Sequence, residues 1–303
     1  MIDRYHLRYF LSVVDTGNFS RGAAACNVSQ PTLSVGIARM EAALGRPLFN
    51  RTNRRVELTE AGVRLLAHAR MIEGEFAAAE REVAGTVDVR TIRLGVLSTT
   101  PRRWIEHVLR ERRAFPTGDR IEIVEGSERD LRGRLARGRV DAALTIVRDD
   151  DDADTLRPIL TEGYALALGA AHPLATRGSV RVEELVNDPM IVRRHCELLS
   201  ETSRFFTARG IRPFFPARTT SDDKALSYVR AGMGVTVMPD GFREPGVARV
   251  ALEGFDFTRT LGLIHAAHVD PHAASYRQIA DALIAAAAAD DTGRDLAPRH
   301  DRR

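Results

Sequence analysis

One segment of the sequence places a thiol beside cations, an imidazole and a carboxylate: Arg193-Arg194-His195-Cys196-Glu197. An apolar run typical of a strand, Met190 to Val192, precedes it, and a helical pattern follows. A cysteine at such a strand-to-helix turn lies near cations and near a helix dipole, and both stabilise its thiolate. Cys196 is therefore a candidate for redox chemistry. The alternative is a cysteine that only packs or lines a cleft.

The number of cysteines limits that chemistry. The second cysteine is Cys26, in a helical part of the sequence, and residues 197–215 contain none. The sequence therefore predicts no intramolecular disulfide switch, no secreted disulfide framework and no cysteine zinc site. A sensor with one cysteine, which stops at sulfenic acid or a mixed disulfide, stays open.

Hydroxyl groups form a second candidate site, at Ser98-Thr99-Thr100-Pro101. These residues end a predicted strand and open a helix, where hydroxyls and free backbone N–H groups bind anions. Ligands of open α/β sheets also lie at the carboxyl ends of strands, and ordinary helix capping is the alternative. Ser127 is expected mainly as a helix N-cap that Asp130 closes. Thr145, in another predicted strand, is the last hydroxyl candidate.

The N-terminal part of the chain offers a polar helix face that suits DNA bases. Ser29 caps this predicted helix, Pro31 is tolerated in its first turn, and Gly45 ends it. Its apolar side consists of Leu33, Ile37, Met40 and Leu44. The side left exposed carries Gln30, Thr32, Ser34, Val35, Gly36 and Arg39.

These exposed residues suggest how the helix contacts DNA. Gln30 can form a bidentate pair with adenine, while Thr32 and Ser34 can meet base edges or phosphates. Val35 and Gly36 cannot hydrogen-bond a base. We therefore expect few direct base contacts and a larger share of specificity from DNA shape.

Two further helices and a hairpin complete this N-terminal unit. Apolar residues at positions 7, 10, 11 and 14 predict a helix that Gly17 ends, and Ser20 is expected to cap a short second helix. Leu48-Phe49 and Val56–Leu58 flank a polar turn, which we interpret as the wing of a winged helix-turn-helix. Its arginines are expected to contact phosphate: Arg51, Arg54 and Arg55.

A long helix is expected to follow from Thr59, which can cap it. Its apolar residues are spaced 4-3-4-3-4, as in the a/d seam of a coiled coil: Leu65, Ala69, Ile72, Phe76, Ala79 and Val83. We predict a dimerisation helix over residues 59–88. The alternative is a helix that lies on its own domain.

From residue 89, short β-rich runs alternate with helical stretches, which predicts an α/β domain with parallel sheets. The charged tail 291–303 is expected to be disordered.

The composition is that of a globular protein, 44% hydrophobic and 28% charged, with a net charge of +3. The lack of a long apolar segment and the polar start of the chain lead us to expect a cytoplasmic protein. Phosphate-loop, dinucleotide-binding, zinc-hydrolase and nucleophile-elbow motifs are missing, so we expect no enzyme, no cofactor and no metal.

Many of these residues resemble the N-terminal signature of LysR-type transcriptional regulators. The matching segments are Phe10-Leu11-Ser12-Val13-Val14, Gly17-Asn18-Phe19-Ser20, Ala23-Ala24, Val28-Ser29-Gln30-Pro31-Thr32-Leu33-Ser34, Pro47-Leu48-Phe49 and Leu58-Thr59-Glu60-Ala61-Gly62. The resemblance implies an α plus α/β protein in three parts. A winged helix-turn-helix is expected at 1–58, a coiled-coil linker helix at 59–88 and a two-lobed, periplasmic-binding-protein-like effector domain at 89–303. Lobe I would comprise about 89–162 and 266–290, and lobe II about 163–265.

The resemblance also implies a function. Such a regulator binds double-stranded promoter DNA as a dimer or tetramer, contacts RNA polymerase and responds to a small molecule in the cleft between the lobes. The family's DNA contacts match Ser29, Gln30, Pro31, Thr32, Ser34 and the wing arginines, and the exposed Arg39 is added to them. The effector would lie between Ser98–Thr100 and Arg194–Cys196, and the nearby arginines favour an anion such as a carboxylate.

Three alternatives stay open. The His-Cys pair at 195–196 resembles the family's peroxide-sensing branch, so thiol or oxidant sensing through Cys196 is the alternative function within the family. An enzyme fused to a DNA-binding module is a second alternative. An architectural DNA-binding protein without an effector is the third.

Overall fold

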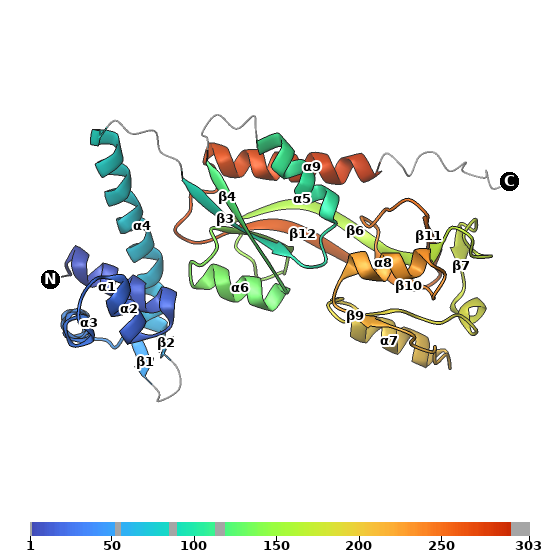
Figure 1. Ribbon diagram of the computed structural model, residues 1–303, viewed down its shortest axis with the longest axis horizontal. Helices are drawn as coiled ribbons and strands as arrows, with labels where there is room; N and C mark the ends of the chain where they lie inside the picture. Colours follow the sequence, from blue (N-terminus) through green and yellow to red (C-terminus); the bar gives the residue numbers. More distant parts are fainter. Residues whose placement is uncertain (1, 52–55, 85–89, 113–118, 292–303) are drawn as a thin grey trace.

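The computed structural model describes residues 2–51, 56–84, 90–112 and 119–291. A helical domain at the N-terminus is followed by the long helix α4 and by an elongated α/β domain (Figure 1). Arg54, Arg55, the predicted linker end 85–88 and the predicted tail from residue 292 lie outside the described residues. The same holds for the side chain of Arg51.

The N-terminal domain contains α1 (Arg4–Thr16), α2 (Phe19–Ala25), α3 (Gln30–Leu44), β1 (Phe49–Arg51) and β2 (Val56–Leu58). Ser29 caps α3 as predicted, because its Oγ accepts a hydrogen bond from the backbone N–H of Thr32 at 3.2 Å. Asn18, rather than the predicted Ser20, caps α2. Gly17 and Gly45 end α1 and α3 in the left-handed conformation, which glycine adopts without steric cost.

Two residues of α3 lie on sides of the helix other than those predicted. Leu44, expected in the apolar stripe, is 38% exposed. Gly36, expected on the exposed face, is buried against α1, where an added Cβ would lie 2.7 Å from Cδ2 of Tyr9. Glycine at this position therefore allows two helices to approach closely. The prediction that Gly36 takes up part of the DNA-reading face was wrong.

Helix α4 (Glu60–Ala84) begins where the sequence predicts it. The Oγ1 of Thr59 accepts a hydrogen bond from the N–H of Gly62 at 3.0 Å, which caps the first turn. The helix then leads from the N-terminal domain toward the α/β domain (Figure 1).

One mixed sheet runs through the α/β domain in the order β4-β3-β5-β12-β6-β11-β7, with β10 also paired to β6. Its strands are β3 (Thr91–Leu97), β4 (Arg120–Gly126), β5 (Ala142–Ile146), β6 (Leu156–Gly169), β7 (Ser179–Val180), β10 (Thr236–Pro239), β11 (Val247–Leu252) and β12 (Thr258–His265). Strand β3 is parallel to β4 and β5, but β12 is antiparallel to both β5 and β6. The prediction of parallel sheets was therefore wrong for the strands that join the two lobes.

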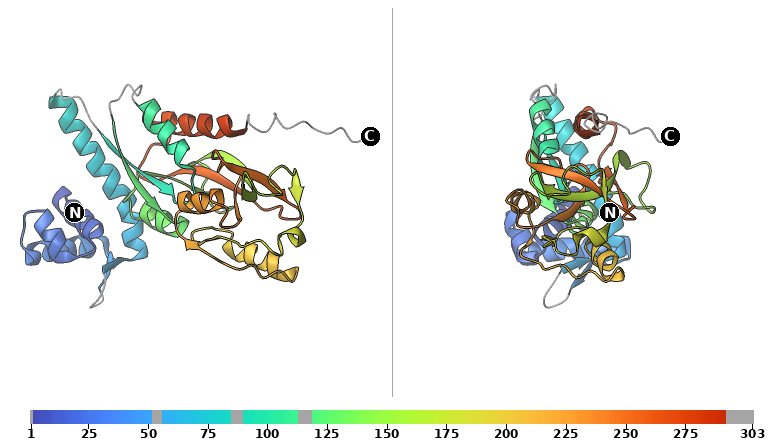
Figure 2. Two further views of the ribbon diagram at one scale, coloured as in Figure 1. Left: turned by 45° about the vertical axis from the view of Figure 1, so that its right-hand side comes forward. Right: turned by 90° about the vertical axis from the view of Figure 1, so that its right-hand side faces the viewer.

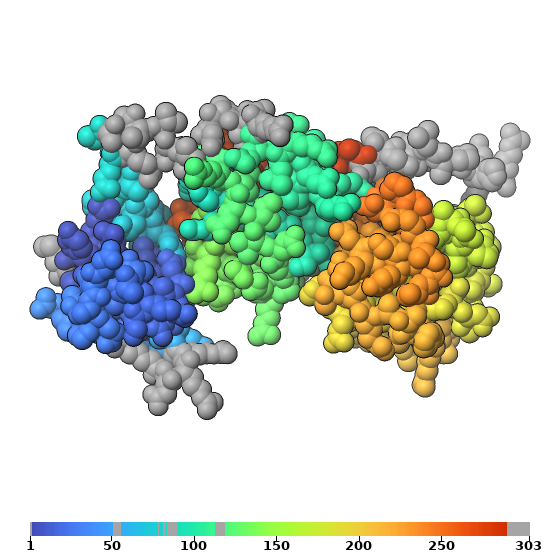
Figure 3. Space-filling view, in the orientation of Figure 1, coloured from blue at the N-terminus to red at the C-terminus, as the bar shows by residue number. Residues whose placement is uncertain are grey.

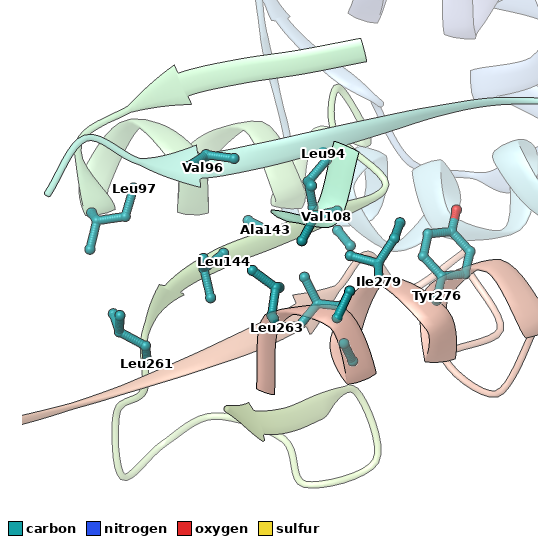
Figure 4. Packing of buried hydrophobic residues seen from close by; sticks show 14 of the residues in the cluster. Leu94, Val96, Leu97, Val108, Ala143, Leu144, Leu261, Leu263, Tyr276 and Ile279 are labelled. Atoms are coloured by element: carbon teal, nitrogen blue, oxygen red, sulfur yellow. The ribbon is translucent and has the colours of Figure 1, made fainter. Parts of the chain in front are cut away.

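Helices cover both faces of the sheet in lobe I, where α5 and α9 lie on one side and α6 on the other (Figure 1). Their bounds are α5 (Arg102–Glu111), α6 (Glu128–Ala136) and α9 (Ala274–Asp291). The lobe I core lies between the sheet and α5 and α9, and includes Leu94, Leu144, Leu263 and Ile279 (Figure 4). Since β12 contributes to this core and also pairs with β6 near lobe II, it crosses the boundary expected between the lobes.

Lobe II is built around a separate core. Its further elements are η2 (Val182–Leu185), β8 (Val192–Arg193), α7 (Leu199–Ala208), β9 (Arg218–Thr219) and α8 (Asp222–Arg230). Leu166, Phe206, Val237 and Val250 are buried in this core. Figure 3 shows the lobes as two adjoining masses, green and orange.

The N-terminal domain lies at the end of the molecule away from lobe II (Figure 2, left) and contacts lobe I through Arg139. The guanidinium of Arg139 donates to the backbone carbonyls of Val14 and Asp15, at 3.0 and 3.3 Å. Cations are favourable at this carboxyl end of a helix. Within the described ranges, no helix is long and apolar enough to cross a membrane, and no cluster of His, Cys, Asp or Glu is suited to a metal ion.

Candidate nucleic-acid interface and interlobe cleft

The exposed face of α3 gathers the hydrogen-bonding side chains that the sequence predicts for DNA. Nε2 of Gln30 donates to Oγ of Ser34 at 2.9 Å, one helical turn away. The hydroxyls of Ser29 and Thr32 lie 2.7 Å apart. Val35 is 52% exposed, and Arg39 is exposed as well. The face therefore offers amide, hydroxyl, methyl and guanidinium groups over three turns, a length that fits the major groove.

The predicted dimerisation seam on α4 divides into two parts. Leu65 and Ala69 pack on the core of their own N-terminal domain. Ile72, Phe76 and Val83 are 39%, 44% and 90% exposed, and Ala79 is exposed too. The first turns of α4 therefore lie on their own domain, as the alternative expects, whereas the later turns leave apolar side chains exposed, and dimerisation through them stays a prediction.

A cavity of about 450 Å³ lies between the lobes. Lobe I lines it with the segment after β3, with α5 and with Glu125, and lobe II lines it with the turn after β8, the start of α8 and Phe242. Three of the predicted effector residues line this cavity: Ser98, Thr100 and His195. The buried Oγ1 of Thr100 has no hydrogen-bond partner within the described chain.

Charge in the cleft is mainly negative. The acidic residues of its lining are Glu106, Glu125, Asp222 and Asp223, against Arg102 and His195. Arg102 is already close to Glu106, with Nε 3.3 Å from Oε1. Both oxygens of Asp222 accept from Arg193 at 2.6 Å, and this buried pair raises the pKa of the guanidinium above its ordinary value although burial opposes the charge.

The other predicted effector residues lie outside this cavity. Thr99 is buried beside it and accepts from Arg259, Ser127 caps α6 by accepting from Asp130 N at 3.3 Å, and Thr145 is buried in β5. Arg194 is exposed, and its N–H donates to the carbonyl of Thr219.

Cys196 faces a different cavity, inside lobe II. Burial raises the pKa of its thiol, and the charge of Arg193 lowers that pKa by less than burial raises it. The predicted stabilisation of the thiolate by a nearby cation is therefore present, but burial outweighs it. No disulfide joins Cys196 to Cys26, and both are free thiols.

A buried arginine in β12 connects the walls of the cleft. Nη1 of Arg259 donates to Oγ1 of Thr99 at 2.9 Å and to Oε1 of Glu197 at 2.6 Å, while Nη2 donates to Oε1 of Glu162 at 2.7 Å. The other oxygen of Glu162 accepts from the N–H of Gly241 at 2.5 Å. These bonds join lobe I, the crossing strands and lobe II at one point.

The charges of this cluster support one another. The hydroxyl of Tyr164 donates to Oε1 of Glu197 at 2.6 Å. Burial alone would raise the pKa of Glu197, but the charge of Arg259 and the bond from Tyr164 outweigh it and hold that pKa below its ordinary value. Burial lowers the pKa of Arg259, and the carboxylates of Glu162 and Glu197 more than reverse this, so that it is raised.

Sequence reasoning missed this cluster. The available signal was a charged residue inside a β-rich run, at Glu162 before the buried part of β6 and at Arg259 within β12. Such residues are rarely buried unless they are paired. Their partners lie far away in the sequence, so the pairing itself had no local signal.

Two models of known protein families match this chain. The family model described as "Bacterial regulatory helix-turn-helix protein, lysR family" matches residues 5–63. The model described as "LysR substrate binding domain" matches residues 86–287, which is more than half of the chain.

Individual relatives and solved structures agree with these matches. A probable hydrogen peroxide-inducible genes activator of Mycobacterium avium is 33% identical over 238 residues, covering 77% of this chain and 76% of that protein. Full-length OxyR from Pseudomonas aeruginosa has the same fold, with a TM-score of 0.66 at 22% identity, over 93% of this chain and 95% of that one. Full-length CbnR in complex with its target DNA matches with a TM-score of 0.50 at 19% identity, over 94% and 99%.

The helix-turn-helix with its exposed α3 face lies within the range of the first family model. The two-lobed domain, with the residues that line its interlobe cavity, lies within the range of the second. The chain therefore belongs to the LysR family of DNA-binding transcriptional regulators.

Proposed function

We propose that this regulator reads its promoter through α3 and changes transcription when a small molecule occupies the cavity between the lobes. The single observation that carries the proposal is the buried hydroxyl of Thr100, which lines that cavity and has no partner in the described part of the chain. Buried polar groups are normally hydrogen-bonded. A ligand that donates a hydrogen bond to this hydroxyl, or accepts one from it, would supply the missing partner.

The lining narrows the chemistry of the effector. Arg102, the one arginine among the described lining residues, is already close to Glu106, whereas Glu125 and Asp223 add negative charge. This gives little support to the anionic effector expected from the sequence. It favours a polar molecule with hydroxyl or amine groups, since carboxylates accept hydrogen bonds from both.

The contacts of the cleft also suggest how ligand binding could affect the DNA-binding domain. Closing or opening the cleft would move the lobe II residues that contact Arg259 relative to Thr99 of lobe I. Lobe I in turn touches the N-terminal domain through Arg139. We infer that this motion alters the arrangement of subunits on DNA and the contact with RNA polymerase in the bacterial cytoplasm, and that the cleft binds its ligand without converting it.

The experiment is a thermal-shift screen of metabolites with three proteins: wild type, Thr100→Val and Thr145→Val. Both threonines have buried hydroxyls without a described partner, but only Thr100 lines the cavity. At about 100 times its Kd a ligand stabilises the wild type by about 2.7 kcal/mol. We expect Thr100→Val to lose this shift and Thr145→Val to keep it. Equal shifts in all three proteins would place the effector elsewhere.

Oxidant sensing through Cys196 is the second candidate, because the M. avium relative is named as a hydrogen peroxide-inducible activator. The raised pKa of the thiol counts against it. If Cys196 is the sensor, Cys196→Ser abolishes the transcriptional response to peroxide, and mass spectrometry finds sulfenic acid or a mixed disulfide on that residue. A full response in Cys196→Ser would rule this candidate out.

A further inference from the structure

Lobe II contains a second cavity, of about 610 Å³, apart from the interlobe cleft. Residues of helix α7 form one wall, and residues of β8, β9 and β10 form the other. Figure 1 shows α7 next to β9. Most of its surface is apolar, with side chains that include Met190, Leu199, Phe206, Ile211, Phe215 and Val237. A volume of this size falls in the range of about 300–1,000 Å³ that is typical of small-molecule sites.

Cations stand at the edge of this apolar cavity. Arg212 and Arg218 both line it and are exposed to solvent, and neither forms an ion pair with a carboxylate of the described residues. The guanidinium of Arg218 lies 5.4 Å from the ring of Phe215. The hydroxyls of Ser200 and Ser203, on the α7 wall, add further polar groups to the lining.

We propose that this lobe II cavity binds an amphipathic anion, with an apolar body between α7 and β10 and a carboxylate at Arg212 and Arg218. Burial of an alkyl or aromatic body supplies the affinity. The two guanidinium groups recognise a carboxylate at the surface, where it keeps part of its hydration. This ligand is distinct in charge and place from the effector proposed for the interlobe cleft.

The position of Cys196 connects the two cavities. Its side chain lines the lobe II cavity, the preceding residue His195 lines the interlobe cleft, and the following residue Glu197 accepts from Arg259. A ligand that displaces this turn therefore acts on the contact between the lobes. A ligand in the lobe II cavity would therefore lie beside the turn that contacts Arg259.

Decanoate is the probe, because it joins one carboxylate to an apolar chain. Calorimetric titration of the full-length protein with decanoate is expected to show saturable binding, whereas acetate, which lacks the apolar chain, does not bind. Ser203→Phe narrows the cavity from the α7 wall and abolishes binding. The double variant Arg212→Gln/Arg218→Gln weakens binding about tenfold, as expected for two exposed charges.

Two controls test whether decanoate binds in the lobe II cavity. Arg204→Gln changes an arginine of α7 that pairs with Glu201 and does not line the cavity, so it leaves decanoate binding unchanged. Decanoate also slows the reaction of Cys196 with a maleimide, which mass spectrometry separates from that of Cys26.

Three results would each overturn the inference: no saturable decanoate binding, equal weakening by Arg204→Gln, or loss of binding in Thr100→Val with full binding in Ser203→Phe. The last result would move decanoate into the interlobe cleft. The cleft proposal is tested with Thr100→Val and with metabolites rather than decanoate. Failure of one proposal can therefore be distinguished from failure of the other.

Discussion

Arg259 and Glu197 form a largely buried ion pair, with Nη1 and Oε1 2.6 Å apart, that joins a strand shared by both lobes to the turn after β8. The same guanidinium also holds Thr99 of lobe I and Glu162 of β6. Glu197 directly follows His195, which lines the interlobe cleft, and Cys196, which lines the lobe II cavity, so the pair holds a turn that both cavities share. The free energy of this ion pair is therefore expected to affect both the stability of the lobes and their response to ligands.

Replacement of Arg259 by methionine should destabilise the protein by about 3–5 kcal/mol, because it leaves Glu162 and Glu197 buried without their cation. Urea unfolding followed by tyrosine and tryptophan fluorescence measures this loss. The control is Arg157→Gln, which removes an exposed ion pair with Asp281 and should cost less than about 1 kcal/mol. Similar losses in the two variants would mean that the Arg259 cluster is not a special stabilising element.

The lowered pKa of Glu197 makes a separate prediction about pH. A carboxylate whose pKa is lower in the folded state stabilises that state above its ordinary value of 4.5, and this stabilisation is lost as the pH falls through the folded pKa. Glu197→Gln lacks this contribution. The difference in unfolding free energy between wild type and Glu197→Gln should therefore be largest at about pH 7 and shrink at about pH 4 and below. A difference that stays constant over this range would show that the charge of Glu197 contributes nothing.

The parts of the fold that depend on short sequence separations were predictable. The apolar periodicity of α1 and α3, the caps at Ser29 and Thr59 and the glycine stops at Gly17 and Gly45 all act within a few residues, so their signals are local. The resemblance in these same segments also gave the family, which the family models confirm.

The parts that depend on distant pairing were not predictable. Arg259 contacts Glu162 and Glu197 at separations of 97 and 62 residues, and the antiparallel pairing of β6 with β12 that brings them together has no local signal. The side of α3 that carries Gly36 is set by Tyr9 on another helix. For the same reason Thr99 and Thr100, adjacent in sequence, have different surroundings.

Gly36 provides a test of that helix contact. Gly36→Ala should destabilise the N-terminal domain by about 1–3 kcal/mol, because its Cβ would meet Tyr9 at 2.7 Å and His6 at 3.0 Å. The matched control is Gly74→Ala in α4, where nothing lies within 4 Å of the new Cβ. Helix propensity then raises stability by up to about 1 kcal/mol. Thermal unfolding of both variants decides the matter: a stabilised Gly36→Ala would show that α1 and α3 do not meet so closely.

The exposed part of the α4 seam should mediate dimerisation. Phe76→Glu places a charge in the stripe formed with Ile72 and should shift the protein toward monomers in sedimentation-velocity experiments, since burial of a charge in an apolar seam is costly. Met71→Glu, at a position 47% exposed and outside the seam, is the control and should leave the sedimentation coefficient unchanged. Equal effects of the two substitutions would argue against the seam as the interface.

The last prediction concerns how α3 reads DNA. Gln30 donates to Ser34 in the free protein, so its amide is already oriented along the exposed face. Gln30→Ala should weaken binding to the specific operator by about 1–3 kcal/mol and binding to random DNA much less. Arg39→Gln, which removes an exposed cation suited to phosphate, should weaken both by similar factors and reduce the salt slope by about 1. Gel-shift titrations at several salt concentrations separate the two patterns. If Gln30→Ala behaves like Arg39→Gln, the glutamine does not read a base, and the specificity of α3 must then come from Thr32, Ser34 and the shape of the DNA.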